Sequence, residues 1–195
     1  MTATHAKPNA IYSYVALLRG INVGGVNNVS MAALKATFEE LGFAGVRTYI
    51  NSGNVLFQSH EANSRALETA IEMAIARHFP APIRVMVRSA VQMAAIMAHL
   101  PESWNEPADK RCNVIYLSQS IDSPSLVQAF NPKPGIEELH YFPGVLFWSA
   151  QLSGLKKSNM IKLNSSPLYQ DMTIRGLNTT RRLREMLQQL SSSQS

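Results

Sequence analysis

The sequence of 195 residues lacks several features that would assign a class of protein at once. It has a single cysteine, Cys112, so it can form no internal disulfide, and the apolar residues around Cys112 indicate a buried small side chain rather than a redox group or a nucleophile. It has no run of about eighteen apolar residues and no apolar stretch near the N-terminus, so it predicts neither a membrane span nor a secretory signal. We therefore expect a cytoplasmic protein that makes no membrane contact.

The usual motifs of cofactor, metal and hydrolytic chemistry are also missing. The glycines at 20, 24 and 25 have the spacing G-x-x-x-G-G, which differs from the dinucleotide-binding G-x-G-x-x-G, and no Lys-Ser or Lys-Thr follows them as in a P-loop. The five histidines are scattered without the spacing of a metal site, and no serine lies in G-x-S-x-G. The acidic pairs Glu39-Glu40 and Glu137-Glu138 are expected to be solvated surface groups. We predict no cofactor and no metal, and we assign no catalytic residue.

The net charge of +5 is unevenly distributed along the chain. Residues 156–195 contain seven basic side chains and two acidic ones, whereas basic and acidic side chains balance in the rest of the sequence. A basic C-terminal quarter favours phosphates or acidic surfaces as partners, although a solvated helix face would have the same composition. The charge alone leaves both interpretations open.

Apolar residues recur with strand and helix periods in an order that is found twice. In the first half we expect a strand at 11–19, a helix at 30–41, a hairpin of 46–50 and 55–57, a helix at 66–79 and a strand at 83–87. In the second half we expect a strand at 113–117, a helix around 124–130, a hairpin of 139–142 and 145–148, a helix at 155–163, an extended piece at 172–175 and a helix at 179–190.

The order β-α-β-β-α-β is that of the ferredoxin-like unit. We therefore predict an α+β protein with two ferredoxin-like halves that form one compact unit with mainly antiparallel sheets. The halves are expected at about 11–88 and 112–190, with a connector at about 89–111, all within a single domain of residues 1–195.

The most informative segment is the loop that follows the first expected strand. Arg19 ends an apolar run, and the loop that follows is rich in glycine and asparagine before Ser30 begins a helix. Glycines let a ligand approach the main chain, amides donate hydrogen bonds, and a helix N-terminus attracts anions. The sequence therefore predicts an anion-binding site at this loop.

Polar groups at the ends of other apolar strands complete the candidate site. The predicted ligand-binding residues are Arg19, Gly20, Asn22, Gly24, Gly25, Asn27, Arg47, Tyr49, Ser52, Asn54, Arg175, Asn178 and Thr179. Each also has a structural interpretation: Asn54 serves the hairpin turn, Arg47 pairs with a surface acid, and Asn178 caps the last helix.

Three segments resemble the bacterial family known as domain of unknown function 1697. They are ALLRGINVGG at 16–25, VRTYINSGNV at 46–55 and TIRGLNT at 173–179, and together they cover nearly the whole chain. In the last segment the family has Thr-x-Arg-Asn-Trp-x-Thr, whereas this chain has Gly176 and Leu177 in the middle, so the match there rests on Arg175, Asn178 and Thr179. The resemblance implies two intertwined ferredoxin-like halves in a single cytoplasmic domain, and it implies no activity.

Three functions remain open on the sequence. The leading hypothesis is a binding module for a phosphorylated small molecule or a nucleic-acid backbone. The alternatives are an enzyme acting on a phosphate or carboxylate substrate, and a structural or interaction protein in which the polar residues only hold loops together. The oligomeric state is not predicted.

Overall fold

The computed structural model describes residues 10–22, 28–105, 109–160, 163 and 166–192. By its internal contacts the chain divides into two compact units, Met1–Met93 together with Leu183–Ser195, and Ala94–Arg182. The two boundaries fall inside two helices, α3 (Ala90–Ala98) and α5 (Leu177–Ser192).

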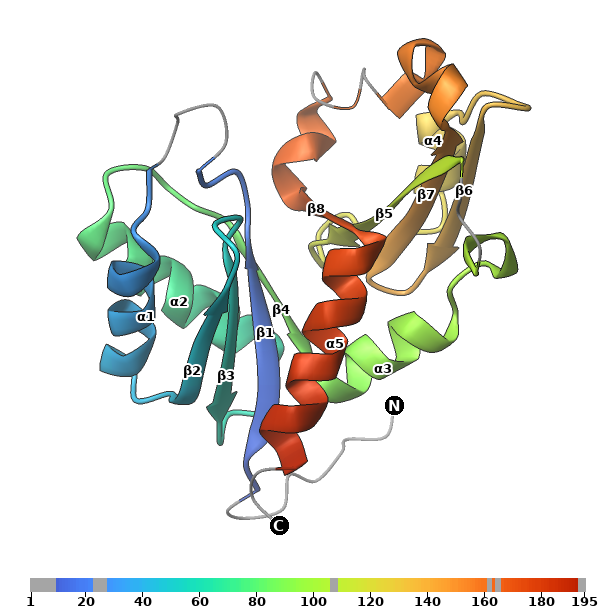
Figure 1. Ribbon diagram of the computed structural model, residues 1–195. Helices are drawn as coiled ribbons and strands as arrows, with labels where there is room; N and C mark the ends of the chain where they lie inside the picture. The colour runs from blue at the N-terminus through green and yellow to red at the C-terminus, as the bar shows by residue number, and fades with distance from the viewer. Residues whose placement is uncertain (1–9, 23–27, 106–108, 161–162, 164–165, 193–195) are drawn as a thin grey trace. The chain divides into compact units, whose positions relative to one another are not determined.

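The first unit has the element order β-α-β-β-α-β (Figure 1). Its elements are β1 (Tyr12–Leu18), α1 (Met31–Glu40), β2 (Ala44–Tyr49), β3 (Asn54–Ser59), α2 (Ser64–His78) and β4 (Val85–Ser89). The strands form one antiparallel sheet in the order β2-β3-β1-β4. This order and these crossovers are those of the ferredoxin-like unit, as predicted.

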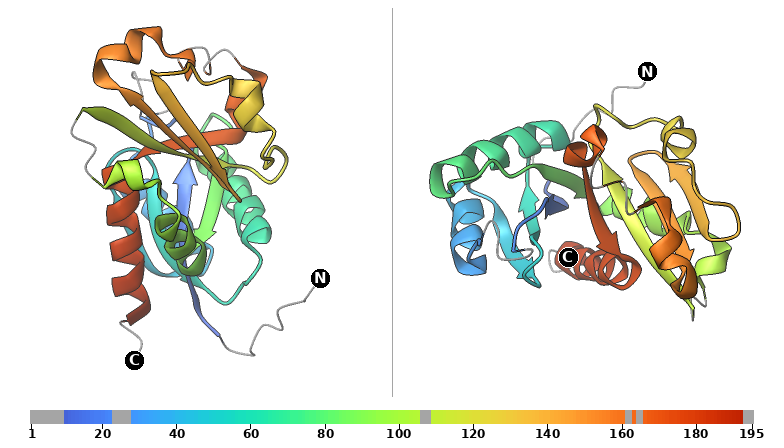
Figure 2. Two further views of the ribbon diagram at one scale, coloured as in Figure 1. Left: turned by 90° about the vertical axis from the view of Figure 1, so that its right-hand side faces the viewer. Right: turned by 90° about the horizontal axis from the view of Figure 1, so that it is seen from above.

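Side chains alternate between the two faces of this sheet, and other elements pack against each face. Tyr14, Ala16 and Leu18 of β1 belong to a core with α1 and α2, which lie on the same side of the strands (Figure 2). The last turns of α5 lie against the opposite face, where the Gln58 Nε2 donates to the Leu190 carbonyl at 3.2 Å. Both faces of the first sheet are therefore covered at the central strand β1, which is almost completely buried, whereas the edge strand β2 is largely exposed.

Capping residues set where the first helices begin. The Ser30 Oγ accepts a hydrogen bond from the Ala33 N–H, and the Asn63 Oδ1 accepts from the N–H groups of Arg65 and Ala66. Each bond satisfies a backbone donor that has no partner within the helix. The predicted start of the first helix at Ser30 is confirmed to within one residue.

The second unit repeats the strand order with shorter helices. After α3 and a 3-10 turn, η1 (Glu102–Trp104), it has the elements β5 (Lys110–Leu117), α4 (Leu126–Phe130), β6 (Glu137–Phe142), β7 (Val145–Gln151), the 3-10 helices η2 (Leu152–Lys157) and η4 (Pro167–Asp171), and β8 (Met172–Gly176). Its antiparallel sheet has the order β6-β7-β5-β8, which matches β2-β3-β1-β4 position by position. The predicted α+β class with a repeated ferredoxin-like arrangement is thereby confirmed.

One expected helix is absent as such. The sequence predicts a helix over 155–163, whereas the described residues of this range form 3-10 turns: η2 ends at Lys157, and residues 159, 160 and 163 follow as further 3-10 residues. The backbone N–H groups of Asn159 and Met160 donate to the Glu137 carboxylate instead of to carbonyls of the preceding turn. A buried acceptor on β6 therefore takes the donors that would have continued the helix.

No helix within the described part of the chain is long and apolar enough to cross a membrane.

Candidate functional site

The candidate site starts where β1 ends. Gly20 has φ +64, and a Cβ added there would meet no atom within 4 Å, so the glycine is required by the backbone conformation and not by crowding. The N–H of Arg19 donates to the carbonyl of Arg84 at 2.9 Å, which holds Arg19 beside the start of β4. Two arginines on neighbouring strand ends are thus fixed next to each other through their backbones.

Asn22 fastens this segment with its side chain. Its Oδ1 accepts from the Val29 N–H at 2.8 Å, and its Nδ2 donates to the carbonyls of Val29 at 3.0 Å and Asn51 at 2.9 Å. Asn22 itself has φ +55, a left-handed conformation that asparagine adopts more readily than most residues. The side chain therefore joins Asn22 to Val29 and ties both to the β2–β3 turn.

The β2–β3 turn lies directly against the end of β1. The Leu18 N–H donates to the Gly53 carbonyl at 2.8 Å. A Cβ on Gly53 would lie 2.7 Å from the Cβ of Leu18, so no larger residue fits. Asn54 is fully buried, and its Nδ2 donates to the Tyr49 carbonyl and to the Ser52 Oγ, each at 3.0 Å. Asn54 and Ser52 thus stabilise the β2–β3 turn through hydrogen bonds within it.

The remaining early candidates lie on β2. Arg47 pairs with Leu56 across the sheet and is exposed, and Tyr49 pairs with Asn54 and is half-buried. The structure therefore brings together Arg19, Gly20, Asn22, Ser52 and Asn54, and we call this hydrogen-bonded group at the end of β1 and in the β2–β3 turn the frame. Tyr49 and Arg47 lie on β2, the strand that precedes this turn. Gly24, Gly25 and Asn27 lie outside the described residues.

The late candidates belong to the second unit. The Arg175 Nη1 donates to the Thr173 Oγ1 and to the Ile174 carbonyl, each at 2.8 Å. Burial of the Arg175 guanidinium lowers its pKa to about 10, and the nearby Tyr116 opposes the shift. Asn178 is exposed and Thr179 half-buried in the first turn of α5. Because α5 begins at Leu177, Asn178 lies inside the helix and not at the cap position that its structural interpretation required.

A family model described as "Protein of unknown function (DUF1697)" matches residues 11–147 of the chain. The chain belongs to this family. The matched residues include the frame at the end of β1 and stop before β8, so Arg175, Asn178 and Thr179 lie beyond them.

A solved structure supports the fold of this DUF1697 member. The conserved bacterial protein SP0830 from Streptococcus pneumoniae is 29% identical in sequence, and the two structures superpose with a TM-score of 0.80. The superposition covers 91% of this chain and 99% of the streptococcal one. No curated protein matches the DUF1697 chain.

The repeat in this DUF1697 chain contains equivalences that the sequence analysis missed. The Leu117 N–H donates to the Gly144 carbonyl and the Ser118 N–H to the Asp171 carbonyl, each at 2.9 Å. These two bonds repeat those of Leu18 with Gly53 and of Arg19 with Arg84. Ser118 and Asp171 in the second unit therefore stand where the first unit has Arg19 and Arg84, and an alignment of the two halves could have found the pair.

Asp122 occupies a place in the second unit like that of Asn22 in the first. Its Oδ1 accepts from the Gly144 N–H at 2.9 Å and from the Tyr141 hydroxyl at 3.0 Å, so it also ties the segment after a strand to the following hairpin turn. We call Asn22 and Asp122 the braces, because the side chain of each joins the segment after a strand to the following hairpin turn. Asp122 is an acid, whereas Asn22 is neutral. Together with Asp171 it makes the end of β5 acidic.

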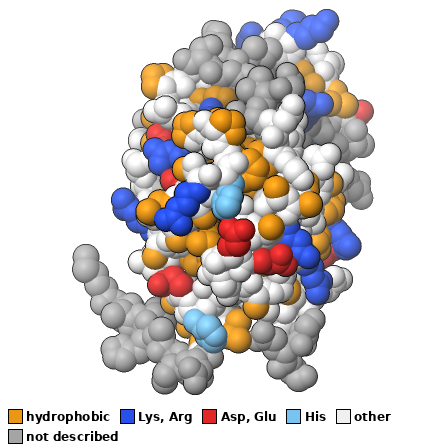
Figure 3. Space-filling model, turned by 90° about the vertical axis from the view of Figure 1, so that its left-hand side faces the viewer, with side chains coloured by type: hydrophobic (Ala, Val, Ile, Leu, Met, Phe, Trp, Pro, Cys, Tyr) orange, Lys and Arg blue, Asp and Glu red, His pale blue; other side chains and the backbone are white. Residues whose placement is uncertain are grey.

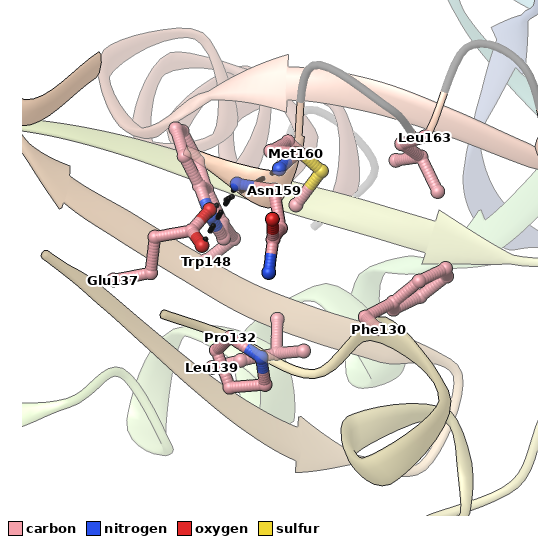
Figure 4. A pocket seen from close by; sticks show the side chains of 8 residues that line it. All are labelled: Phe130, Pro132, Glu137, Leu139, Trp148, Asn159, Met160 and Leu163. Carbon is pink, nitrogen blue, oxygen red and sulfur yellow. Dashed lines mark hydrogen bonds between the residues drawn. The ribbon is translucent and has the colours of Figure 1, made fainter. Parts of the chain in front are cut away.

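Glu137 was expected on the surface, and that expectation is wrong. The residue is 8% exposed, and its carboxylate accepts five hydrogen bonds, whose donors are the N–H groups of Lys133, Asn159 and Met160, the Trp148 Nε1 and the Ser158 Oγ. Figure 4 shows Glu137 with Trp148, Asn159 and Met160. Burial by itself would raise the pKa of this carboxyl, but the hydrogen bonds outweigh it and lower the pKa to about 2. Glu137 lines two hollows, one of about 20 Å³ beside Trp148 and Asn159 and one of about 140 Å³ beside Lys110 and Ser149. We assign Glu137 a structural role because its carboxylate oxygens already accept five hydrogen bonds from the protein.

The face formed by α1 and α2 provides no comparable basic feature. Acidic and basic side chains are interspersed over it (Figure 3), and some are paired, such as Lys35 with Glu39 at 3.5 Å and His78 with Glu40 at 3.0 Å. Three or more metal-ligating side chains do not gather anywhere among the residues that the structure describes.

Proposed function

We propose that this DUF1697 protein binds a phosphate-bearing anion at the end of β1, with Arg19 and Arg84 as the cationic groups and the backbone around Gly20 as a source of N–H donors. The observation that carries the proposal is the contrast with the second unit. The same pair of backbone bonds positions arginines at 19 and 84 in one unit, and Ser118 and Asp171 in the other. The proposal includes a cytoplasmic location and a phosphorylated small molecule or a nucleic-acid backbone as the partner.

The chemistry of the two arginines suits a phosphate. A guanidinium presents several N–H donors in one plane and binds phosphate oxygens in pairs. The Arg84 side chain is 61% exposed, and its Nη1 lies 3.7 Å from the Glu72 carboxylate, a distance at which an exposed ion pair contributes little. A phosphate can therefore compete with Glu72 for the Arg84 guanidinium.

The frame around the site is rigid because its polar groups are bonded to one another. The Asn22 and Asn54 amides together donate four hydrogen bonds to the loop and to the turn. Turns with left-handed residues, such as those at 20 and 22, are the kind in which consecutive backbone N–H groups form anion-binding concavities. A site that is held in place before the ligand arrives loses less entropy on binding. We assign Asn22, Ser52 and Asn54 to this frame, and direct ligand contacts by Arg47, Tyr49, Arg175, Asn178 and Thr179 stay predictions.

Titration of the protein with inorganic phosphate and with a short single-stranded RNA, at low and high salt, tests the proposal. We expect phosphate to bind to the wild type and Arg19→Ala to weaken binding by about tenfold, the value of one charge-assisted hydrogen bond. Arg77→Ala, which removes an exposed arginine from α2, is the matched control and is expected to change nothing. Equal affinities of wild type and Arg19→Ala would contradict the proposal, as would the absence of binding.

The same samples test the structural alternative. Asn22→Ala is expected to lower the melting temperature on either account, but if the polar residues only hold loops together, no anion raises the melting temperature of the wild type. A ligand that binds only the folded state raises the melting temperature further as its concentration rises, with a logarithmic dependence once the site is saturated.

A further inference from the structure

The turn next to the proposed anion site contains an isoleucine in a strained conformation. Ile50 has φ +47, in the left-handed region that β-branched residues strongly avoid. Its side chain is nevertheless 49% exposed, so burial of the side chain gives little in return for the strained backbone. Asparagine or glycine would adopt this conformation at a lower cost.

The surrounding contacts hold the turn in this conformation. The carbonyl of Asn51, the next residue, accepts the Asn22 Nδ2 at 2.9 Å, and the carbonyl of Tyr49, the preceding residue, accepts the Asn54 Nδ2 at 3.0 Å. Gly53, three residues on, is wedged against Leu18 and Ile21. Strained residues persist where their surroundings over-determine them, and they concentrate at functional sites.

Other exposed large apolar residues do not share this feature. Ile11, Met73, Val91 and Leu152 are all at least 43% exposed, and none has a positive φ. Single exposed apolar residues of that kind need no explanation. Ile50 is distinguished because exposure and strain coincide there, one residue away from the carbonyl that Asn22 binds.

We infer that Ile50 determines specificity at the anion site, where it contacts the apolar part of an organic phosphate whose phosphate group is bound at Arg19. The inference rests on the proposed function and adds the ligand class: a phosphate monoester with an aromatic or aliphatic group, as opposed to inorganic phosphate. The bonds from Asn22 to Asn51 and from Leu18 to Gly53 place the turn that contains Ile50 beside the segment with Arg19 and Gly20.

Two phosphate monoesters with the same phosphate group and different apolar parts, methyl phosphate and phenyl phosphate, serve as probes. We expect the wild type to bind phenyl phosphate about fivefold to tenfold more tightly, in line with the burial of part of one aliphatic side chain. Ile50→Asn is expected to abolish this preference and to leave the affinity for methyl phosphate unchanged. The same variant is expected to keep or raise the melting temperature, because asparagine relieves the strain. Met73→Gln, at a 57% exposed position of α2, is the control and is expected to keep the preference.

The outcomes separate the inference from the proposed function. If neither monoester binds the wild type, both are wrong. If both bind with equal affinity, or if Ile50→Asn keeps the preference, only the role of Ile50 is wrong. A lower melting temperature for Ile50→Asn would show that Ile50 packs for stability, and this too would overturn the inference alone.

Discussion

The ends of β1 and β5 have the same arrangement of hydrogen bonds but side chains of opposite charge. In each, the last strand residue donates to a glycine carbonyl of the hairpin turn, the next residue donates to the residue before the fourth strand, and a side chain further on braces the turn. The first unit has arginines and a neutral brace at these places, and the second has a serine and two acids. The contrast separates the residues that the shared hydrogen bonds require from those that a ligand would require. The turn glycines and the braces occur in both units, whereas the arginines occur only in the first.

The two units also differ in how they cover their sheets. In the first, α1 and α2 have 10 and 15 residues and cover one face with regular helices. In the second, the 5-residue α4 and 3-10 helices take their place, and the chain after η2 is held by the Glu137 carboxylate. A buried acceptor with several donors thus replaces the internal hydrogen bonds of a longer helix.

Removal of the Glu137 carboxylate should have the largest effect on the second unit. Glu137→Ala removes the acceptor of five donors, two of them on the buried Trp148 and Ser158, and of the five the Met160 N–H keeps a second acceptor, the Ser158 Oγ. We expect the free energy of unfolding to fall by about 4 kcal/mol, since each orphaned buried donor costs about 1 kcal/mol or more. Urea denaturation checks this, with Glu102→Gln at an exposed position as the control. A decrease of less than about 1 kcal/mol in the free energy of unfolding would contradict the role of Glu137 as the acceptor that holds the chain after η2.

The pH dependence of stability gives a second test of Glu137. Its pKa is about 2 in the folded state, below the ordinary value of 4.5, so its ionised form stabilises the fold at neutral pH. That contribution is present above about pH 5 and is lost as the pH falls toward 2. Glu68 in the first unit has its pKa raised by burial, so its contribution has the opposite sign. Denaturation at pH 7, 5 and 3 should show a smaller loss for Glu137→Gln than for the wild type, and an unchanged loss would contradict this account.

Converting the end of β1 into the end of β5 should abolish anion binding. The double variant Arg19→Ser with Arg84→Asp gives the first unit the residues that the second has, and it keeps the backbone bonds that both share. We expect phosphate affinity to fall by about a hundredfold, because two charge-assisted contacts are lost and an acid is added. Isothermal titration calorimetry measures this, and a circular dichroism melt confirms that the fold is kept. Retained affinity would place the anion elsewhere.

Substitution of the two braces, Asn22 and Asp122, should have the smallest of these effects. Asn22→Ala removes three hydrogen bonds and a left-handed asparagine, so we expect a loss of about 2 kcal/mol in the free energy of unfolding. Asp122→Ala removes two bonds at an exposed position, and we expect about 1 kcal/mol. Asn28→Ala, at an exposed position of the same loop, is the control. A larger loss for Asp122→Ala than for Asn22→Ala would contradict the comparison.

Local patterns in the sequence were sufficient for most of the fold. The alternation of Tyr14, Ala16 and Leu18 with their neighbours, the cap at Ser30 and the glycine turn at 53 are all short-range features, and the repeated element order followed from them. The prediction of a helix over 155–163 was wrong because the N–H groups of Asn159 and Met160 donate to Glu137, a residue about twenty positions earlier.

The candidate site depends on contacts between residues that are distant in the sequence. For that reason only some of its residues could be predicted from the sequence. The glycines and asparagines after Arg19 indicated a loop, but the role of Asn22 as a brace depends on its contact with Asn51, 29 positions away. Arg84 was not among the candidates, because nothing near it in sequence marks it as a neighbour of Arg19. Arg175 repeats Arg88 of β4, since each donates from Nη1 to the carbonyl of the preceding residue, so its motif also has a structural use.

The most direct test of anion binding at the end of β1 is a titration of the ¹⁵N-labelled protein with phosphate, followed by NMR of the backbone amides. The account predicts that the largest shifts occur at Arg19, Gly20 and Arg84, with smaller ones in the turn at 50–53, and that the equivalent amides of Ser118, Gly144 and Asp171 do not move. Equal shifts at both ends, or shifts confined to the second unit, would contradict it.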